Sequence, residues 1–157
     1  METDDLKRPV ISTACPAVVR LIRIRFPNLI PNLLPLYAPV DFAARIAREE
    51  AIKETGLRDE EIGVFFITPC AAKATCAQYP IGLEKSNIDG AISIKDVYRK
   101  VLPYLKQTNL KPLAKAGLKG ICWANSGGES KASGNDNYIA VDGIHNVLNI
   151  LEDIENR

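Results

Sequence analysis

Two short segments of the chain place a cysteine where an apolar run ends and a helical pattern begins. The segment "ISTACPAVVRL" (11–21) carries Cys15 directly before a proline, and "FFITPCAAK" (65–73) carries Cys70 directly after one. A helix N-terminus stabilises the thiolate form of cysteine, which ligates metals and attacks substrates. The prolines stiffen both turns and so fix the direction of each sulfur. The pattern predicts a shared thiolate site for an iron-sulfur cluster or a zinc ion.

The alternative interpretation is that both cysteines are small buried residues at strand ends, because free cysteine is among the most buried residue types. A reducing cytosol disfavours disulfides and leaves metal binding, redox chemistry or burial as explanations. The chain has two further cysteines, Cys76 and Cys122. The spacing from Cys70 to Cys76 exceeds that of typical zinc knuckles, and the apolar context of Cys122 favours burial. Cys76 stays open as an additional ligand.

Three other places hold residues that could take part in a site. Lys73 would ordinarily be a surface lysine, but it follows Cys70 by three positions. His145, in the first turn of the last predicted helix, is interpreted as a surface or packing residue, although histidine is a common metal ligand. The segment 126–128 could offer backbone N–H groups to an anion, yet glycine turns are more often only turns.

Short β-type runs predict strands at 9–13, 62–68, 88–93 and 138–141, of which 62–68 is apolar enough to be covered on both faces. Strands that alternate with helices predict one α/β domain over residues 1–157, with a mainly parallel sheet flanked by helices.

Helical spacing of apolar residues predicts four helices between and after these strands. The first begins at Pro16, and the second spans 41–56 with alanines on its buried face. The third begins after Ser93, which forms a capping pair with an aspartate three positions on, and the last has Asp142 as its N-cap. Prolines at intervals of four between the first two helices predict a connection of short turns.

Length and charge limit the classes of protein. A chain of 157 residues buries about 70% of its unfolded surface, which is enough for one core. The formal charge of +1 offers no global field for nucleic acid or an anionic membrane. Arg20, Arg23 and Arg25 are interpreted as the solvated side of the first helix. No apolar run approaches about 18 residues, and "METDD" lacks the basic start of a signal peptide, so a cytoplasmic location is predicted.

The two cysteine motifs resemble those of a known family. "S-T-A-C-P" (12–16) and "T-P-C-A-A-K" (68–73) are similar to the first two signature motifs of the catalytic domain of iron-only ([FeFe]) hydrogenases, which read roughly T-S-C-C-P and M-P-C-x-x-K-x-x-E. The resemblance covers nearly the whole chain, since three further segments also look like the family: "RFPNLIPNLLPLYAP" (25–39), "NIDGAISIKDVYRKV" (87–101) and "NSGGESKA" (125–132).

The resemblance implies a fold, a cofactor and roles for residues. The fold would be one lobe of the hydrogenase catalytic domain. Cys15 and Cys70 would be two of the four thiolates that hold a 4Fe-4S cluster, and Lys73 would be the catalytic residue that hydrogen-bonds a diatomic ligand of an attached diiron unit. Three positions depart from the family. Its proton-donating cysteine is Ala14 here, the glutamate of its second motif is Cys76, and the methionine of M-P-C is Thr68.

These departures predict slow turnover of hydrogen, because a methyl group cannot carry a proton. The pattern looks like the sensory branch of the family. The family's third cysteine motif, with the other two cluster ligands, is not found, so the chain is expected to be a fragment of a longer iron-sulfur protein. It would carry no cluster by itself.

The preferred hypothesis is that the chain is part of a 4Fe-4S binding domain for redox or hydrogen sensing or electron transfer, and is inert in isolation. The expected partners are the remainder of its own chain, including ferredoxin-like domains, and a redox protein. Exposed cluster-facing surface also predicts a homodimer. The alternatives are a segment of a working hydrogenase, which oxidises hydrogen or reduces protons, and a cofactor-free α/β interaction module.

Overall fold

The computed structural model describes residues 6–105 and 125–157. The chain divides into two compact units, Met1–Thr108 and Asn109–Arg157. The described elements of the first unit are the helices α1 (Pro16–Arg25), α2 (Pro39–Thr55), α3 (Ala71–Gln78) and α4 (Ile94–Leu105), the 3-10 helices η2 (Pro27–Asn32) and η3 (Asp59–Glu61), and the strands β1 (Phe65–Thr68) and β2 (Gly90–Ser93). Those of the second unit are the helices α5 (Gly128–Ala132) and α6 (Ile144–Glu155). The single-domain organisation stays a prediction.

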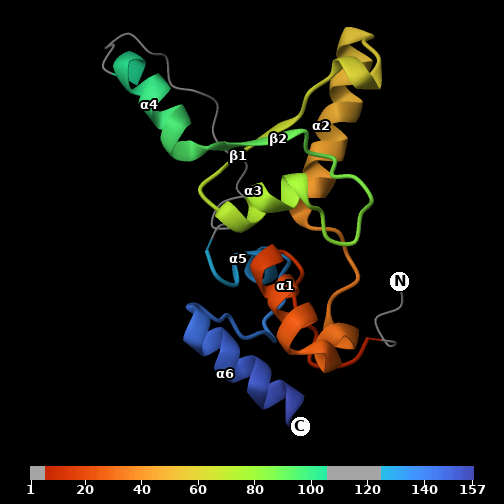
Figure 1. Ribbon diagram of the computed structural model, residues 1–157, viewed down its shortest axis with the longest axis vertical. Coiled ribbons are helices and arrows are strands. Elements are labelled where there is room, and N and C mark those ends of the chain that lie inside the picture. Colours follow the sequence, from red (N-terminus) through yellow and green to blue (C-terminus); the bar gives the residue numbers. More distant parts are fainter. Residues whose placement is uncertain (1–5, 106–124) are drawn as a thin grey trace. The chain divides into compact units, whose positions relative to one another are not determined.

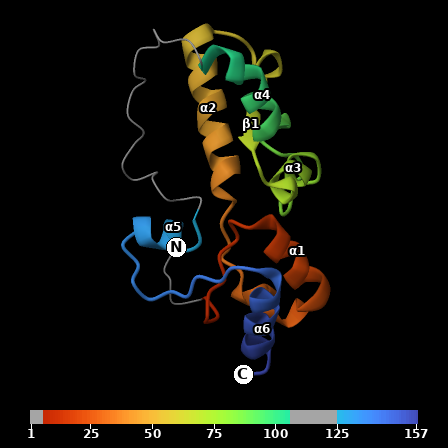
Figure 2. The same ribbon diagram turned by 90° about the vertical axis from the view of Figure 1, so that its left-hand side faces the viewer.

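A two-stranded parallel sheet organises the first unit. β1 and β2 lie side by side, in a register that runs from Phe65 opposite Gly90 to Thr68 opposite Ser93 (Figure 1). Helix α3 connects them and contacts both strands, as a parallel pair requires. Figure 2 shows α2 and α3 on either side of β1, and both helices contact it. The predicted α/β class, with a parallel sheet packed against helices, is confirmed.

Helix ends in the first unit follow from proline and glycine. Helix α1 begins at Pro16, as predicted, because proline has the backbone angle of a helix and lacks the N–H that would go unpaired there. Helix α2 likewise begins at Pro39. It ends at Gly56, whose φ of 69° lies in the left-handed region that glycine enters without strain.

The core beside the cysteine turns is built from α1 and η2. Val19, Ile22, Phe26 and Leu29 are all buried, and the two helices contact each other. Buried Asn32 closes this core by donating from Nδ2 to the carbonyl oxygen of Pro9 at 3.0 Å. The proline-rich connection after α1 therefore packs as short turns, as predicted.

The predicted strand at 9–13 is wrong. Ile11 forms only an isolated parallel bridge with Leu33, supported by hydrogen bonds from the Ile11 N–H to the Asn32 carbonyl at 2.7 Å and from the Leu34 N–H to the Ile11 carbonyl at 2.9 Å. The segment 9–13 pairs with the loop after η2 at one residue only, so the two segments form no ladder of hydrogen bonds and no strand.

Two predictions of burial are also wrong. Phe65 and Ile67, on one face of β1, are 60% and 49% exposed, so the strand is covered on one face and open on the other. In α2, Ala44 is buried, but Ala43 and Ala47 are exposed. Helix α2 contacts β1. Because the sheet has only two strands, it covers a narrow stripe of the helix surface, and the alanines outside that stripe stay exposed.

The second unit contains one predicted helix but not the strand before it. Helix α6 forms over nearly the predicted range, while residues 138–141 lie in irregular backbone. A strand needs a neighbour that pairs its backbone groups, and the described part of this unit offers none. The N-cap of α6 is Gly143 rather than Asp142. No helix among the described residues is long and apolar enough to cross a membrane.

Candidate functional site

Cys15 is the N-cap residue of α1. Its backbone is extended, with φ of −101° and ψ of 104°, and its carbonyl accepts the Val19 N–H at 3.2 Å to open the helix. The turn before it is tied down by Thr13, whose hydroxyl donates to the Leu36 carbonyl at 2.9 Å. The Cys15 side chain is exposed, so its sulfur is accessible from solvent.

Cys70 is the N-cap residue of α3 and stands in the same relation to its helix. Its carbonyl accepts the Ala74 N–H at 3.1 Å, and its backbone is extended. Its own N–H donates to the hydroxyl of Thr68, also at 3.1 Å. Thr68 is the last residue of β1 and is buried, whereas the Cys70 thiol is half-buried. Strand, turn and helix thus follow each other here as predicted.

The two cysteine-bearing helices are in contact, and an arginine links them. Arg20 of α1 donates from Nη2 to the carbonyl oxygen of Tyr79, the residue at which α3 ends. Its interpretation as a solvated residue is wrong, because Arg20 is half-buried; Arg23 and Arg25 are exposed. The link fixes one helix against the other, which suits a site that takes one ligand from each.

The thiols fit part of an iron-sulfur ligand set. Cys15, Cys70 and Cys76 are free of disulfides, and thiolates are the ligands of such clusters. Each of the first two is the N-cap residue of a helix. Over residues 6–105 and 125–157, no group of three His, Cys, Asp or Glu side chains gathers to hold a metal. When bound, a 4Fe-4S cluster supplies one-electron transfer, and its four positions are usually filled by thiolates.

Lys73 and Cys76 lie in α3 downstream of Cys70. Lys73 is the third residue of the helix, and Cys76 follows three positions later. Residues with this spacing are neighbours on a helix surface, and both are half-buried. In the motif that this segment resembles, the position of Cys76 holds a glutamate. The expected role of Lys73 stays a prediction.

The candidates of the second unit have local roles. The Ser126 hydroxyl hydrogen-bonds the carboxylate of Asp142. Gly127 has φ of 72°, and a Cβ there would lie 2.5 Å from the ring of Tyr138, so the turn itself requires glycine. His145 is exposed. These contacts favour the interpretation of 126–128 as a turn. Cys122 lies outside the described residues.

Sequence reasoning missed an arginine network at the other end of the sheet. The side chain of Arg48, 16% exposed, donates to the Ile62 carbonyl at 2.7 Å and pairs with the Asp89 carboxylate. Asp89 also accepts the Val64 N–H at 2.7 Å. This N–H, opposed by burial and supported by Arg48, holds the pKa of Asp89 below its ordinary value of 3.8. No spacing in the sequence links Arg48 to Asp89, which lies 41 positions away.

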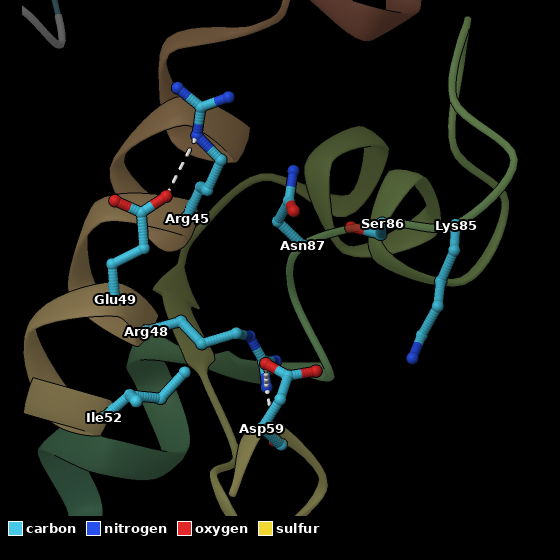
Figure 3. A pocket seen from close by; sticks show the side chains of 8 residues that line it. All are labelled: Arg45, Arg48, Glu49, Ile52, Asp59, Lys85, Ser86 and Asn87. Carbon is cyan, nitrogen blue, oxygen red and sulfur yellow. Dashed lines mark hydrogen bonds and ion pairs between the residues drawn. The ribbon is translucent and has the colours of Figure 1, made fainter.

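A pocket lies beside this network, and most of the charged residues that line it form ion pairs within the protein (Figure 3). Its lining is strongly polar and comprises Arg45, Arg48, Glu49, Ile52, Asp59, Lys85, Ser86 and Asn87. Two of its three cations are paired, Arg45 with Glu49 at 3.7 Å and Arg48 with Asp59 at 3.4 Å. Val64 and Asp89 precede the strands, so the network lies at their starts, whereas Cys70 follows the end of β1. The pocket is therefore separate from the cysteine turns.

Comparison with protein families matches most of the chain to one family model. The family model described as "Iron only hydrogenase large subunit, C-terminal domain" matches residues 1–114 of the 157. The matched range includes Cys15, Cys70 and Lys73, and with them both cysteine turns. No curated protein matches the chain.

Proposed function

The chain belongs to the family of the iron-only hydrogenase large subunit, C-terminal domain, and from this premise we propose that Cys15 and Cys70 are two of the four thiolates of a 4Fe-4S cluster. The observation that carries the proposal is their equivalent placement. Each is the extended N-cap residue of a helix, and the two helices contact each other. Thiols that occupy the same position on two contacting helices suit a shared ligand.

The role of this site is redox or hydrogen sensing, or electron transfer, rather than rapid turnover. Ala14, directly before the ligand Cys15, has a methyl group where the family carries its proton-donating cysteine. General acid and base steps need a titratable group within hydrogen-bond reach, and alanine has none. Cys76 places a thiol where the family carries the carboxylate of a glutamate. We assign the chain on these grounds to the sensory branch, with a redox protein as partner.

Iron and acid-labile sulfide in anaerobically reconstituted protein test the proposal. The two are measured for the chain alone and for the chain fused to the third cysteine motif of the family. We expect about four irons per chain in the fusion, because four thiolates then surround the cluster. Cys15→Ser or Cys70→Ser in the fusion should abolish loading, whereas Cys76→Ser should leave it intact. A fusion that folds and holds no iron rejects the proposal.

A second function, that of an interaction module, is favoured by one observation. Helix α4 carries exposed apolar side chains along one face, including Tyr98, Val101 and Leu105. Surfaces of this kind commonly bind other proteins. The iron measurement separates the two functions, since an interaction module needs no cluster. Hydrogen uptake or evolution by the loaded fusion separates a working hydrogenase from a sensor.

A further inference from the structure

Both strands of the sheet turn into a helix by the same device. Thr68 ends β1, Ser93 ends β2, and the two residues are directly opposite each other in the register. Each hydroxyl accepts a backbone N–H from two positions further along: that of Cys70 at 3.1 Å and that of Lys95 at 3.2 Å. Such side-chain bonds offer the backbone an alternative to the ladder and direct it into a turn.

The two turns differ in burial and in what they carry. Thr68 is 5% exposed, whereas Ser93 is exposed. Burial restricts the side chain of Thr68 to a fixed position. Its hydroxyl accepts the N–H of Cys70, the residue proposed as a ligand. The turn at Ser93 leads into α4 with no cysteine. A buried hydroxyl bonded to a ligand residue resembles the outer-shell partners that orient metal ligands.

We infer that Thr68 is a positioning residue for Cys70, an inference that rests on the proposed function. The hydroxyl of Thr68 and the ring of Pro69 together fix the backbone of Cys70, and hence the direction of its Cα–Cβ bond, before a metal binds. A methionine, which the family carries here, has no hydroxyl to do this. The Cys70 N–H is also occupied, so it is not free to donate to a sulfur of the cluster.

Anaerobic titration with Co²⁺ of the fusion that carries the third cysteine motif tests the inference through the absorption of cobalt–thiolate bonds. Thr68→Ser keeps the hydroxyl, whereas Thr68→Ala and Thr68→Val remove it. Removing an outer-shell partner typically weakens metal binding about 10- to 100-fold, so we expect at least a tenfold rise in Kd for Thr68→Ala and Thr68→Val. Thr68→Ser should bind within about twofold of the unaltered fusion and show the same spectrum.

Ser93→Ala is the matched control, because it removes the equivalent hydroxyl from a turn without a cysteine. We expect it to lower the melting temperature while leaving cobalt affinity and spectrum unchanged. If the folded Thr68→Ala variant binds cobalt as tightly as Thr68→Ser, the hydroxyl only caps the helix and the inference is wrong. If the unaltered fusion folds and shows no cobalt–thiolate absorption, the proposed ligand set of Cys15 and Cys70 fails, and the inference falls with it.

Discussion

Cys15 and Cys70 occupy positions where another residue would serve the helix better. Each is an N-cap residue with an extended backbone, and neither side chain makes a capping hydrogen bond with any described residue. Serine is among the preferred N-caps, because its oxygen accepts an N–H of the first turn. A thiol accepts such bonds weakly. Both helix starts therefore lack the stabilising hydrogen bond that a serine N-cap would make. Such a loss is expected where binding rather than folding determines the residue type.

This reasoning predicts opposite effects of one substitution on stability and on binding. Cys70→Ser should raise the free energy of unfolding of the metal-free chain by about 0.5–1 kcal/mol, the usual worth of a cap, while cobalt binding by the fusion is lost. Urea denaturation measures the first effect and cobalt titration the second. Cys76→Ser, inside α3, is the control and should not stabilise the chain. Destabilisation by Cys70→Ser would show that the thiol packs in the core instead.

Asp89 gives the first unit a dependence on acid. Its pKa is lowered in the folded protein, chiefly by the Val64 N–H, so its contribution to stability is complete above the ordinary value of 3.8. That contribution is lost as the pH falls through the lower folded pKa. We expect Asp89→Asn to be less stable than the unaltered chain at neutral pH and to lose less stability on acidification.

Urea denaturation at neutral pH and at about pH 3 checks this prediction. The control is Glu49→Gln, since Glu49 is exposed and its ion-pair partner, Arg45, lies 3.7 Å away. Exposed pairs of this kind contribute little, so the control should match the unaltered chain at both pH values. An equal loss with acid in the Asp89→Asn variant would assign the acid sensitivity to other groups.

Among the elements, α1 and α3 are linked by the long side chain of Arg20. Arg20→Met removes the charged donor to the Tyr79 carbonyl but keeps most of the apolar stem. The Arg20 Nε atom is buried with no hydrogen-bond partner among the described residues, which offsets part of what the contact gains. We therefore expect a net loss of about 1 kcal/mol, below the usual worth of a hydrogen bond from a charged group.

Denaturation with urea measures this loss, and Arg23→Met provides the comparison. Arg23 lies on the same helix and is exposed, so its replacement should change stability by less than about 0.5 kcal/mol. Equal effects of the two substitutions would mean that the Arg20 contact with α3 adds nothing.

The elements also show what sequence reasoning can reach. Helix starts at Pro16 and stops at Gly56 were predictable, because the chemistry that sets them is local. The strands at 9–13 and 138–141 were not, since a strand exists only if a neighbour pairs with it. At the site, adjacent prolines and helical spacing revealed the cysteine turns. The contact of Arg20 with Tyr79 stayed hidden because it joins residues 59 positions apart.

For the whole molecule, the exposed apolar residues predict self-association. In the first unit, Ile94, Tyr98, Val101 and Leu105 follow the helical spacing of one face of α4, and all are exposed. A contiguous apolar face in water favours pairing. We expect the isolated chain to associate as its concentration rises, and the double substitution Val101→Lys and Leu105→Lys to reduce that association.

Sedimentation over a range of concentrations distinguishes this face from the cysteine turns. Ala17→Lys places a charge on the exposed side of α1 two positions after Cys15, and leaves α4 unchanged. If the α4 variant is monomeric and Ala17→Lys still associates, the contact lies on α4 and the thiols stay accessible to a cluster in the dimer. If only Ala17→Lys dissociates, the copies meet at the cysteine turns. Self-association would then cover the surface proposed for the cluster, so the fusion loaded with iron and sulfide should associate less than the unloaded fusion.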